Sequence, residues 1–97
     1  METVPYDKRS GKIWFNGDLV DWKDAKVHVL NHGLHYGSCV FEGIRIYDGK
    51  IFKLDEHIQR LFKSADILDL KIPFEMEKIC LNVEELVKKQ NVVINLK

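Results

Sequence analysis

The sequence of 97 residues predicts an α+β fold, in which an antiparallel sheet carries two helices packed on one face. In the first half of the chain, Asn16-Gly17 and Asp48-Gly49 separate short β-prone runs, and such pairs favour the two-residue turns of β-hairpins. After Lys53, the apolar residues recur at the spacing of amphipathic helices. Because hairpins rather than crossovers join the strands, we expect a two-layer domain whose sheet has one uncovered face. An uncovered face is typical of a chain that forms half of a larger unit.

The composition excludes several classes of protein. It is 45% hydrophobic and 31% charged, which is typical of a soluble globular domain. Fifteen basic residues balance fifteen acidic ones without a basic block, which disfavours a nucleic-acid partner. No apolar run approaches the roughly 18 residues that span a membrane. The charged start METVPYDKRSGK lacks the apolar segment of a secretory signal, so we expect a cytoplasmic protein.

The two cysteines, Cys39 and Cys80, lie in apolar contexts and lack the spacing of metal ligands. We interpret them as reduced core thiols of a cytosolic protein, with a disulfide as the less favoured alternative.

The elements follow in order along the chain. Residues 1–11 are expected to form a tail, and residues 12–97 one small domain. Residues 13–22 are predicted to form the first hairpin and residues 40–54 the second. Between them, residues 25–37 begin with alternating polarity and then meet two glycines, which indicates a short strand followed by a loop.

Two helices are predicted in the second half, near residues 54–68 and 74–90, with Pro73 between them. The apolar stripe of the first consists of Leu54, Ile58, Leu61, Phe62, Ala65 and Leu68. The stripe of the second consists of Met76, Ile79, Cys80, Val83, Leu86 and Val87. The last residues, NVVINLK, are β-prone.

If residues 40–47 form a strand, their side chains alternate between two faces. One face suits the helix-covered side and consists of Val40, Glu42, Ile44 and Ile46. Glu42 is a misfit there and requires a hydrogen-bonding partner. The other face consists of Phe41, Gly43, Arg45 and Tyr47.

That second face has the composition of a pocket wall. Phe41 offers an apolar surface, Gly43 leaves room for a ligand near the backbone, and Arg45 offers a planar fork for a carboxylate. From the pattern alone, a solvent-facing side with a chance glycine is the favoured alternative. Arg60 lies about 130° from the centre of its helix's apolar stripe. It is either a solvated arginine or an anion contact, and periodicity does not choose between them.

Three histidines, His28, His32 and His35, raise a metal hypothesis. Gly33 and the β-prone VHVL argue against the helix that such spacing needs, and suitably spaced carboxylates are missing. Structural histidines or loop hydrogen bonds are therefore favoured, and we predict no metal site. The sequence contains no Ser-His-Asp or Cys-His arrangement, P-loop or dinucleotide fingerprint.

The same residues carry a resemblance to a known family. IWFNGDLVDWKDAKVHVLNHGLHYGSCVFEGIRIY, followed by DEHIQRLFKSADIL, resembles the amino-terminal domain of branched-chain amino acid aminotransferases. These are fold type IV pyridoxal-phosphate enzymes. The resemblance runs from about Lys12 to Asn91 and combines FNG, H-x-x-H-Y-G, F-E-G-I-R and H-x-x-R-L in the family's order. D-amino acid aminotransferase and aminodeoxychorismate lyase share the fold but match these motifs less closely.

The resemblance implies a role for each candidate residue. Tyr36, Phe41 and Gly43 match residues that line the pocket for the aliphatic side chain, with the tyrosine reaching the neighbouring subunit's site. Arg45 matches an arginine that helps order the pocket's polar end. Arg60 matches the arginine that holds the phosphate of pyridoxal 5'-phosphate, since guanidinium offers a planar charged fork. The resemblance also implies a homo-oligomer that acts on branched-chain amino acids and 2-oxo acids. It disfavours both a merely solvent-exposed face at Phe41, Gly43 and Arg45 and a metal site at the histidines.

The chain also departs from the family. The family's Schiff-base lysine belongs to a second, larger domain, and Lys50, Lys53, Lys63 and Lys71 do not match its motif, so no catalytic residue is expected here. Where the family continues with approximately A-Y-I-R-P, this chain reads NVVINLK, which resembles an early stop, a shifted frame or a split gene. Two functions stay open. One is an aminotransferase part that is inactive by itself and does not retain the cofactor, and the other is a non-catalytic remnant that folds and self-associates.

Overall fold

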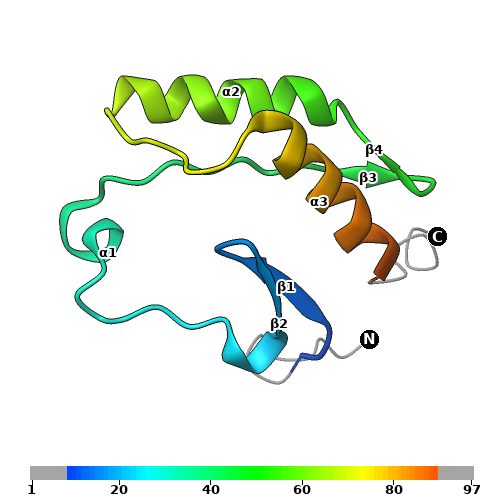
Figure 1. Cartoon of the computed structure of the whole chain (residues 1–97), viewed down its shortest axis with the longest axis horizontal. Coiled ribbons are helices and arrows are strands. Elements are labelled where there is room, and N and C mark those ends of the chain that lie inside the picture. The colour runs from blue at the N-terminus through cyan, green and yellow to red at the C-terminus, as the bar shows by residue number, and fades with distance from the viewer. Residues whose placement is uncertain (1–8, 90–97) are drawn as a thin grey trace.

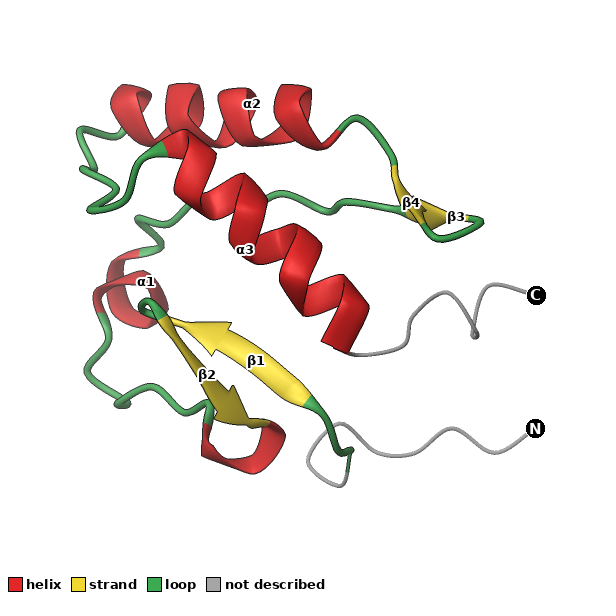
Figure 2. Cartoon of the chain, turned by 45° about the vertical axis from the view of Figure 1, so that its right-hand side comes forward, coloured by secondary structure: helices red, strands yellow, loops and turns green. Residues whose placement is uncertain are grey.

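The computed structural model describes residues 9–89, and its two main helices and short strands confirm the α+β class (Figure 2). Of the expected tail, only residues 9–11 are described, and the β-prone residues 91–97 lie outside the described range. The elements in chain order are β1 (Lys12–Phe15), β2 (Asp18–Asp21), the 3-10 helix η2 (Trp22–Asp24), α1 (His32–Tyr36), β3 (Ile46–Tyr47), β4 (Lys50–Ile51), α2 (Leu54–Ile67) and α3 (Met76–Lys89).

Both predicted hairpins form with the predicted turns. β1 pairs antiparallel with β2, and β3 pairs antiparallel with β4. Asn16 and Gly17 have φ angles of 51° and 98°, and Asp48 and Gly49 have 49° and 77°. Positive φ at both central residues matches the right-handed twist of the flanking strands, which is why Asn-Gly and Asp-Gly are favoured there.

The two hairpins do not join into one sheet. Within residues 9–89 they form two separate two-stranded sheets, whereas the sequence predicts a single sheet. The second hairpin pairs only Ile46 with Ile51 and Tyr47 with Lys50. Residues 40–45, expected to be part of a strand, run without a strand partner in the described structure. Period-two polarity indicates which side chains share a face, but it does not guarantee that a neighbouring strand is present.

The α1 segment also differs from its expected structure. Residues 25–31 form no strand, and a one-turn helix follows where a loop was predicted. The Asn31 side chain caps this helix by accepting a hydrogen bond from the Gly33 N–H at 2.9 Å. Gly37, with a φ of 70°, ends it by donating its N–H to the Gly33 carbonyl. Two local capping signals therefore outweigh the β-propensity of the preceding VHVL.

α3 packs against both α2 and the first hairpin. α3 contacts α2 on one side and β1 on the other, so it lies between α2 and the first hairpin (Figure 1). The Trp14 and Phe74 rings meet edge to face with centroids 5.1 Å apart, which joins β1 to the segment before α3. Among the described residues only Leu54, Ile58 and Ala65 are buried, and all three belong to the predicted stripe of α2. No described helix is long and apolar enough to cross a membrane.

The prediction that both cysteines are core thiols is wrong for Cys39. Cys39 is exposed, Cys80 is half-buried, and neither forms a disulfide. Cys39 lies on the outward side of the unpaired segment, where it approaches Gly33. Burial and the Asp55 carboxylate, whose Oδ1 lies 3.6 Å from the thiol sulfur, raise the pKa of Cys80.

We predict that Ile58→Ala lowers the free energy of unfolding by about 2–5 kcal/mol, because it opens a cavity in a core of few residues. The matched control is Ile67→Ala on the same helix, where the loss should stay within about 0.5 kcal/mol. Ile58 is 3% exposed and Ile67 is 77% exposed. Urea denaturation followed by circular dichroism measures both, and equal losses would contradict this assignment of the core.

Candidate functional site

The segment of residues 40–47 shows the predicted alternation even without a strand partner for most of its length. Its inward side chains are half-buried, and its outward face, defined as Phe41, Gly43, Arg45 and Tyr47, is exposed. Phe41 is 86% exposed, which is unusual for a large aromatic side chain. Nothing lies within 4 Å of a side-chain carbon placed on Gly43. The outward face therefore offers an apolar ring beside open backbone.

Arg45 and Tyr47 complete the outward face. Arg45 Nη1 lies 3.4 Å from the Tyr47 hydroxyl, to which it donates. The Tyr47 ring in turn meets Phe52 edge to face, with centroids 5.6 Å apart. The guanidinium of Arg45 is thus held at the hairpin end of the face, where it is available to a carboxylate.

Glu42 points the other way, toward α2. Its side chain is 7% exposed, and its carboxylate accepts hydrogen bonds from two residues of α2. Arg60 donates from Nε to Oε2 and from Nη2 to Oε1, each at 2.7 Å, and His57 Nδ1 lies 2.7 Å from Oε1. We call Glu42, His57 and Arg60 the Glu42 cluster. It confirms the expectation that an inward Glu42 needs a hydrogen-bonding partner.

The cluster explains the charge state of Glu42. Hydrogen bonds from Arg60, then from His57, stabilise the ionised carboxylate and lower the pKa of Glu42 to about 2. The same contact raises the pKa of Arg60. Both partners of the bidentate pair are therefore charged throughout the neutral range, although Arg60 itself is 66% exposed.

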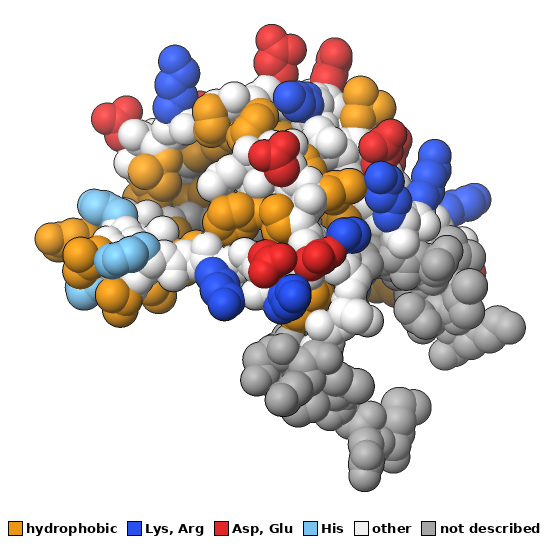
Figure 3. Space-filling view, turned by 60° about the horizontal axis from the view of Figure 1, so that its bottom comes forward, with side chains coloured by type: hydrophobic (Ala, Val, Ile, Leu, Met, Phe, Trp, Pro, Cys, Tyr) orange, Lys and Arg blue, Asp and Glu red, His pale blue; other side chains and the backbone are white. Residues whose placement is uncertain are grey.

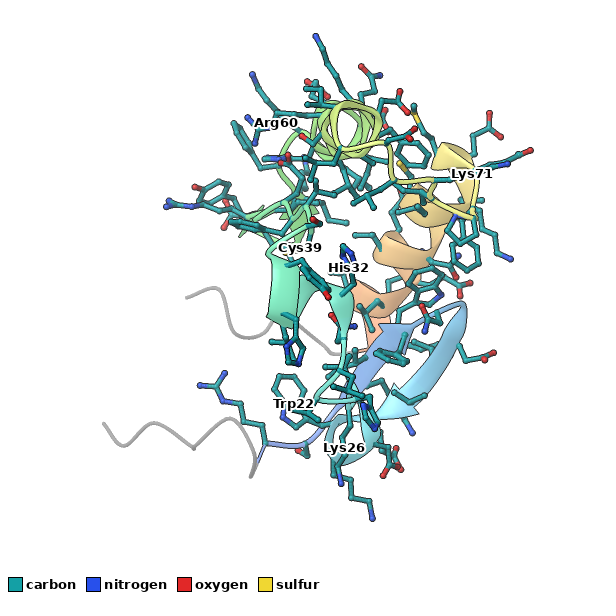
Figure 4. All side chains as sticks on the ribbon, turned by 90° about the vertical axis from the view of Figure 1, so that its left-hand side faces the viewer. Trp22, Lys26, His32, Cys39, Arg60 and Lys71 are labelled. Carbon is teal, nitrogen blue, oxygen red and sulfur yellow. The ribbon has the colours of Figure 1, made fainter. Side chains whose placement is uncertain are left out.

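Arg60 keeps donors for a further anion. In the described structure its Nη1 has no hydrogen-bond partner, while Nε and Nη2 contact Glu42. A recess of about 220 Å³ lies beside it, lined by Lys53, Glu56, His57 and Arg60. Arg60 is on the side of α2 that faces away from α3 (Figure 4). Lys53 and Arg60, together with the Glu56 carboxylate, thus border a small space that is large enough for a group such as a phosphate.

The structure brings some of the predicted site residues close together but not all of them. Phe41, Gly43 and Arg45 share one face, and Arg60 is connected to that segment through Glu42. Tyr36 lies apart at the end of α1, where its ring tilts against His32 with centroids 4.7 Å apart. The α1 segment is rich in exposed apolar side chains, which gather with histidines at the left of Figure 3: Val27, Val29, Leu30, Leu34 and Tyr36.

Two residues at the site were not predicted as site residues, namely His57 and Lys53. His57 precedes Arg60 by three positions, so both side chains project from the same side of the helix. The H-x-x-R spacing was therefore a usable signal. Lys53 has the left-handed φ of 51° at the N-cap of α2, and polarity patterns contain no signal for this placement.

The three histidines near α1 act in local hydrogen bonds and ring contacts. His28 Nδ1 accepts from the Leu30 N–H at 3.0 Å, and His35 Nε2 lies 2.7 Å from the Val29 carbonyl oxygen. His32 contacts Tyr36. Over residues 9–89, no group of three or more potential ligands is placed to hold a metal ion.

A family model for class IV amino-transferases matches residues 39–96, more than half of the chain. The chain therefore belongs to the class IV amino-transferase family. Within this family it is homologous to branched-chain amino acid aminotransferases. It is 54% identical over 91 residues, 94% of its length, to a probable branched-chain-amino-acid aminotransferase of Rickettsia felis.

Solved structures show the same fold. The chain matches the branched-chain amino acid aminotransferase of Escherichia coli with a TM-score of 0.81 and 42% identity over 86% of its length. It matches the branched-chain aminotransferase of the thermophilic archaeon Thermoproteus uzoniensis, solved with norvaline, with a TM-score of 0.77 and 42% identity over 84% of its length. Another solved branched-chain amino acid aminotransferase, complexed with N-(5'-phosphopyridoxyl)-L-glutamate, matches with a TM-score of 0.81 and 42% identity.

The chain is much shorter than these relatives. It spans 31% of the Rickettsia protein and 29% of both the Escherichia coli chain and the Thermoproteus chain. The matched region is therefore about 30% of a branched-chain aminotransferase.

We predict that Glu42 contributes to acid stability. Its pKa is lowered from 4.5 to about 2 in the folded state, so its contribution is fully present above pH 4.5 and is lost as the pH falls through about 2. The difference in unfolding free energy between the wild type and Glu42→Gln should therefore be largest above pH 4.5 and close toward pH 2. Thermal unfolding across this range measures it, with Glu85→Gln, an exposed site on α3, as control. A difference that is constant with pH would show that the carboxylate charge is not what stabilises the fold.

Proposed function

We propose that this chain is the amino-terminal part of a pyridoxal-phosphate-dependent branched-chain amino acid aminotransferase, an enzyme that transfers the amino group of leucine, isoleucine or valine to 2-oxoglutarate. One observation carries the proposal: the FEGIR segment turns Phe41, Gly43 and Arg45 outward while its carboxylate binds Arg60. This short segment thereby carries a substrate face on one side and contacts the anion-binding arginine of α2 on the other. Homology to branched-chain aminotransferases over nearly the whole chain supports this assignment. The two free cysteines support a cytoplasmic location.

The residues present fit the phosphate end of the cofactor. Arg60 has a free Nη1 edge, and Lys53 adds a second cation to the same recess. Charge-assisted contacts from a planar guanidinium are well suited to phosphate oxygens. Pyridoxal phosphate, when bound, supplies the electron sink for chemistry at the amino acid α-carbon. We assign to Arg60 the role of holding its phosphate.

The outward face fits the substrate. Phe41 supplies apolar surface, and Gly43 leaves space for an aliphatic side chain. Arg45 helps to order the polar end, and Tyr36 completes the pocket of a neighbouring subunit. A pocket of this kind discriminates weakly among leucine, isoleucine and valine, because one methylene is worth only about 1–3 kcal/mol.

The chain is proposed to supply binding groups without the catalytic group. Catalysis in this family requires a lysine that bonds covalently to the cofactor, and none of Lys50, Lys53, Lys63 or Lys71 matches that lysine's motif. One charge-assisted contact of about 1.5–3 kcal/mol does not outweigh association costs of about 4 kcal/mol or more. We therefore propose that the chain by itself neither turns over substrate nor retains the cofactor.

A non-catalytic remnant that folds and self-associates is the second candidate function. The observation that favours it is the amount of exposed apolar surface on a chain with so small a core. Phe41 and Tyr36 are among the most exposed aromatic side chains, and exposed apolar surface of this kind tends to be covered by a partner. Self-association is expected under both candidates, so activity distinguishes them.

We predict that the purified chain is colourless and does not convert leucine and 2-oxoglutarate to glutamate, because losing the covalent catalyst removes the reaction route. A coupled glutamate assay with added pyridoxal phosphate tests this, with the Escherichia coli enzyme as positive control. Adding a lysine-bearing domain of a relative in trans should restore turnover if the chain is an aminotransferase part. Restored turnover that is lost in Arg60→Ala supports the proposal, and no turnover with a well-folded complex supports the remnant. Turnover by the chain alone that is abolished by replacing one of its own lysines would place the catalytic residue within it.

We also predict that the chain self-associates at micromolar concentration through a surface that includes Phe41, Tyr36 and Tyr47. Phe41→Glu should weaken association, because it places a charge on the most exposed of these rings. Ile67→Glu is the matched control, because Ile67 is also an exposed apolar residue but lies at the end of α2. Sedimentation velocity measures both, and a monomeric wild-type chain that binds no hydrophobic dye would rule the surface out.

A further inference from the structure

Glu42 connects residues 40–44 to α2 through its side chain. Within the described residues, the backbone of residues 40–44 makes no backbone–backbone hydrogen bond. The next backbone bond along the chain is at Arg45, whose carbonyl accepts from the Phe52 N–H at 2.8 Å. The Glu42 carboxylate, with its three contacts of 2.7 Å to α2, is therefore the main polar connection between this segment and the other residues that the structure describes. Phe41 and Gly43, its chain neighbours, lie on the opposite, outward face.

The same carboxylate orients Arg60. An arginine on an exposed helix face has many rotamers of similar energy, and ordering it on binding a ligand costs affinity. The two parallel contacts from Nε and Nη2 to Glu42 fix the plane of the guanidinium. They occupy one edge of the guanidinium and leave Nη1 at the other edge. Arg60 also lines the recess that contains Lys53.

We propose that Glu42 is a positioning residue that acts on both halves of the site at once. It holds the Arg60 guanidinium with its free edge available to an anion, and it holds Phe41 and Gly43 in their outward orientation. Anion binding at Arg60 and the placement of the substrate face are therefore coupled through one carboxylate. The identity of the anion as a phosphate rests on the proposed function, whereas the coupling rests on the contacts of the Glu42 cluster.

A positioning role for Glu42 and the charge of Glu42 alone predict opposite effects of a Glu42 substitution on phosphate binding. Glu42 is an anion next to the arginine that binds an anion, so electrostatics alone predicts that removing its charge strengthens phosphate binding. Positioning predicts the reverse, because an unheld Arg60 must be ordered by the ligand. Glu42→Gln and Glu42→Asp test the two accounts. Glutamine removes the charge with little change of shape, and aspartate keeps the charge but shortens the reach.

The experiment is a titration of the full chain with inorganic phosphate, followed by NMR of the Arg60 Nε–Hε group and of the Phe41 and Gly43 amides. Arg60→Lys identifies the arginine signal by its loss. We expect the dissociation constant for phosphate to rise at least fivefold in Glu42→Gln and to rise in Glu42→Asp. The control Glu85→Gln removes the same charge from an exposed position on α3 and should stay within twofold of the wild type. Phosphate should shift the Phe41 and Gly43 amides in the wild type and control but not in Glu42→Gln.

Equal or tighter phosphate binding by Glu42→Gln, or an Arg60 Nε–Hε group that is as ordered as in the wild type, would overturn the proposal. If circular dichroism shows that Glu42→Gln does not fold, the Glu42→Asp variant tests the proposal instead. Charge alone predicts no change in the phosphate affinity of that variant. A wild-type chain that binds no phosphate, but whose Arg60 loses order in the Glu42 variants, would contradict the phosphate role under the proposed function. It would still support Glu42 as the residue that positions Arg60.

Discussion

The rest of the site depends on one constraint, which is that a carboxylate withdrawn from water must have hydrogen-bond donors. Glu42 meets this requirement with Arg60 and His57, which come from one helix and lie three positions apart. The pairing determines where residues 40–44 lie against α2, and it determines the plane of an otherwise free guanidinium. Removing Arg60 leaves the Glu42 carboxylate buried with fewer donors, and removing Glu42 leaves the Arg60 side chain mobile. The cluster therefore acts as a unit.

The small size of the core is the second constraint on the structure. A chain of this length buries only about 60–65% of the surface that its unfolded form exposes. Only three described residues, all on α2, are buried, and several large apolar side chains of the α1 segment and the outward face are exposed. These exposed groups are the ones that the proposed function assigns to substrate and subunit contacts. The chain spans about 30% of the length of these relatives.

Most of the structure that could be predicted from the sequence is determined by residues close together in the chain. Asn16-Gly17 and Asp48-Gly49 adopt positive φ because these pairs tolerate it, so both hairpin turns could be read from two residues each. The two helices were predictable because their apolar residues follow the 3.6-residue period, although Leu68 and Met76 of the predicted stripes are exposed. The α1 helix was not predicted, although the Asn31 cap and the Gly37 stop are visible in the sequence, because the β-propensity of VHVL points to a strand.

The sequence by itself determined the turns, the two main helices, the two faces of residues 40–47 and the need of Glu42 for a partner. These follow from local geometry, in which each side chain's direction is set by the backbone period. Only the tertiary structure decided that the partners are His57 and Arg60, which lie 15 and 18 positions away. It also decided that the two hairpins stay separate and that Cys39 is exposed. Alternation indicates which face a side chain takes, but what meets that face depends on contacts between segments distant in the chain.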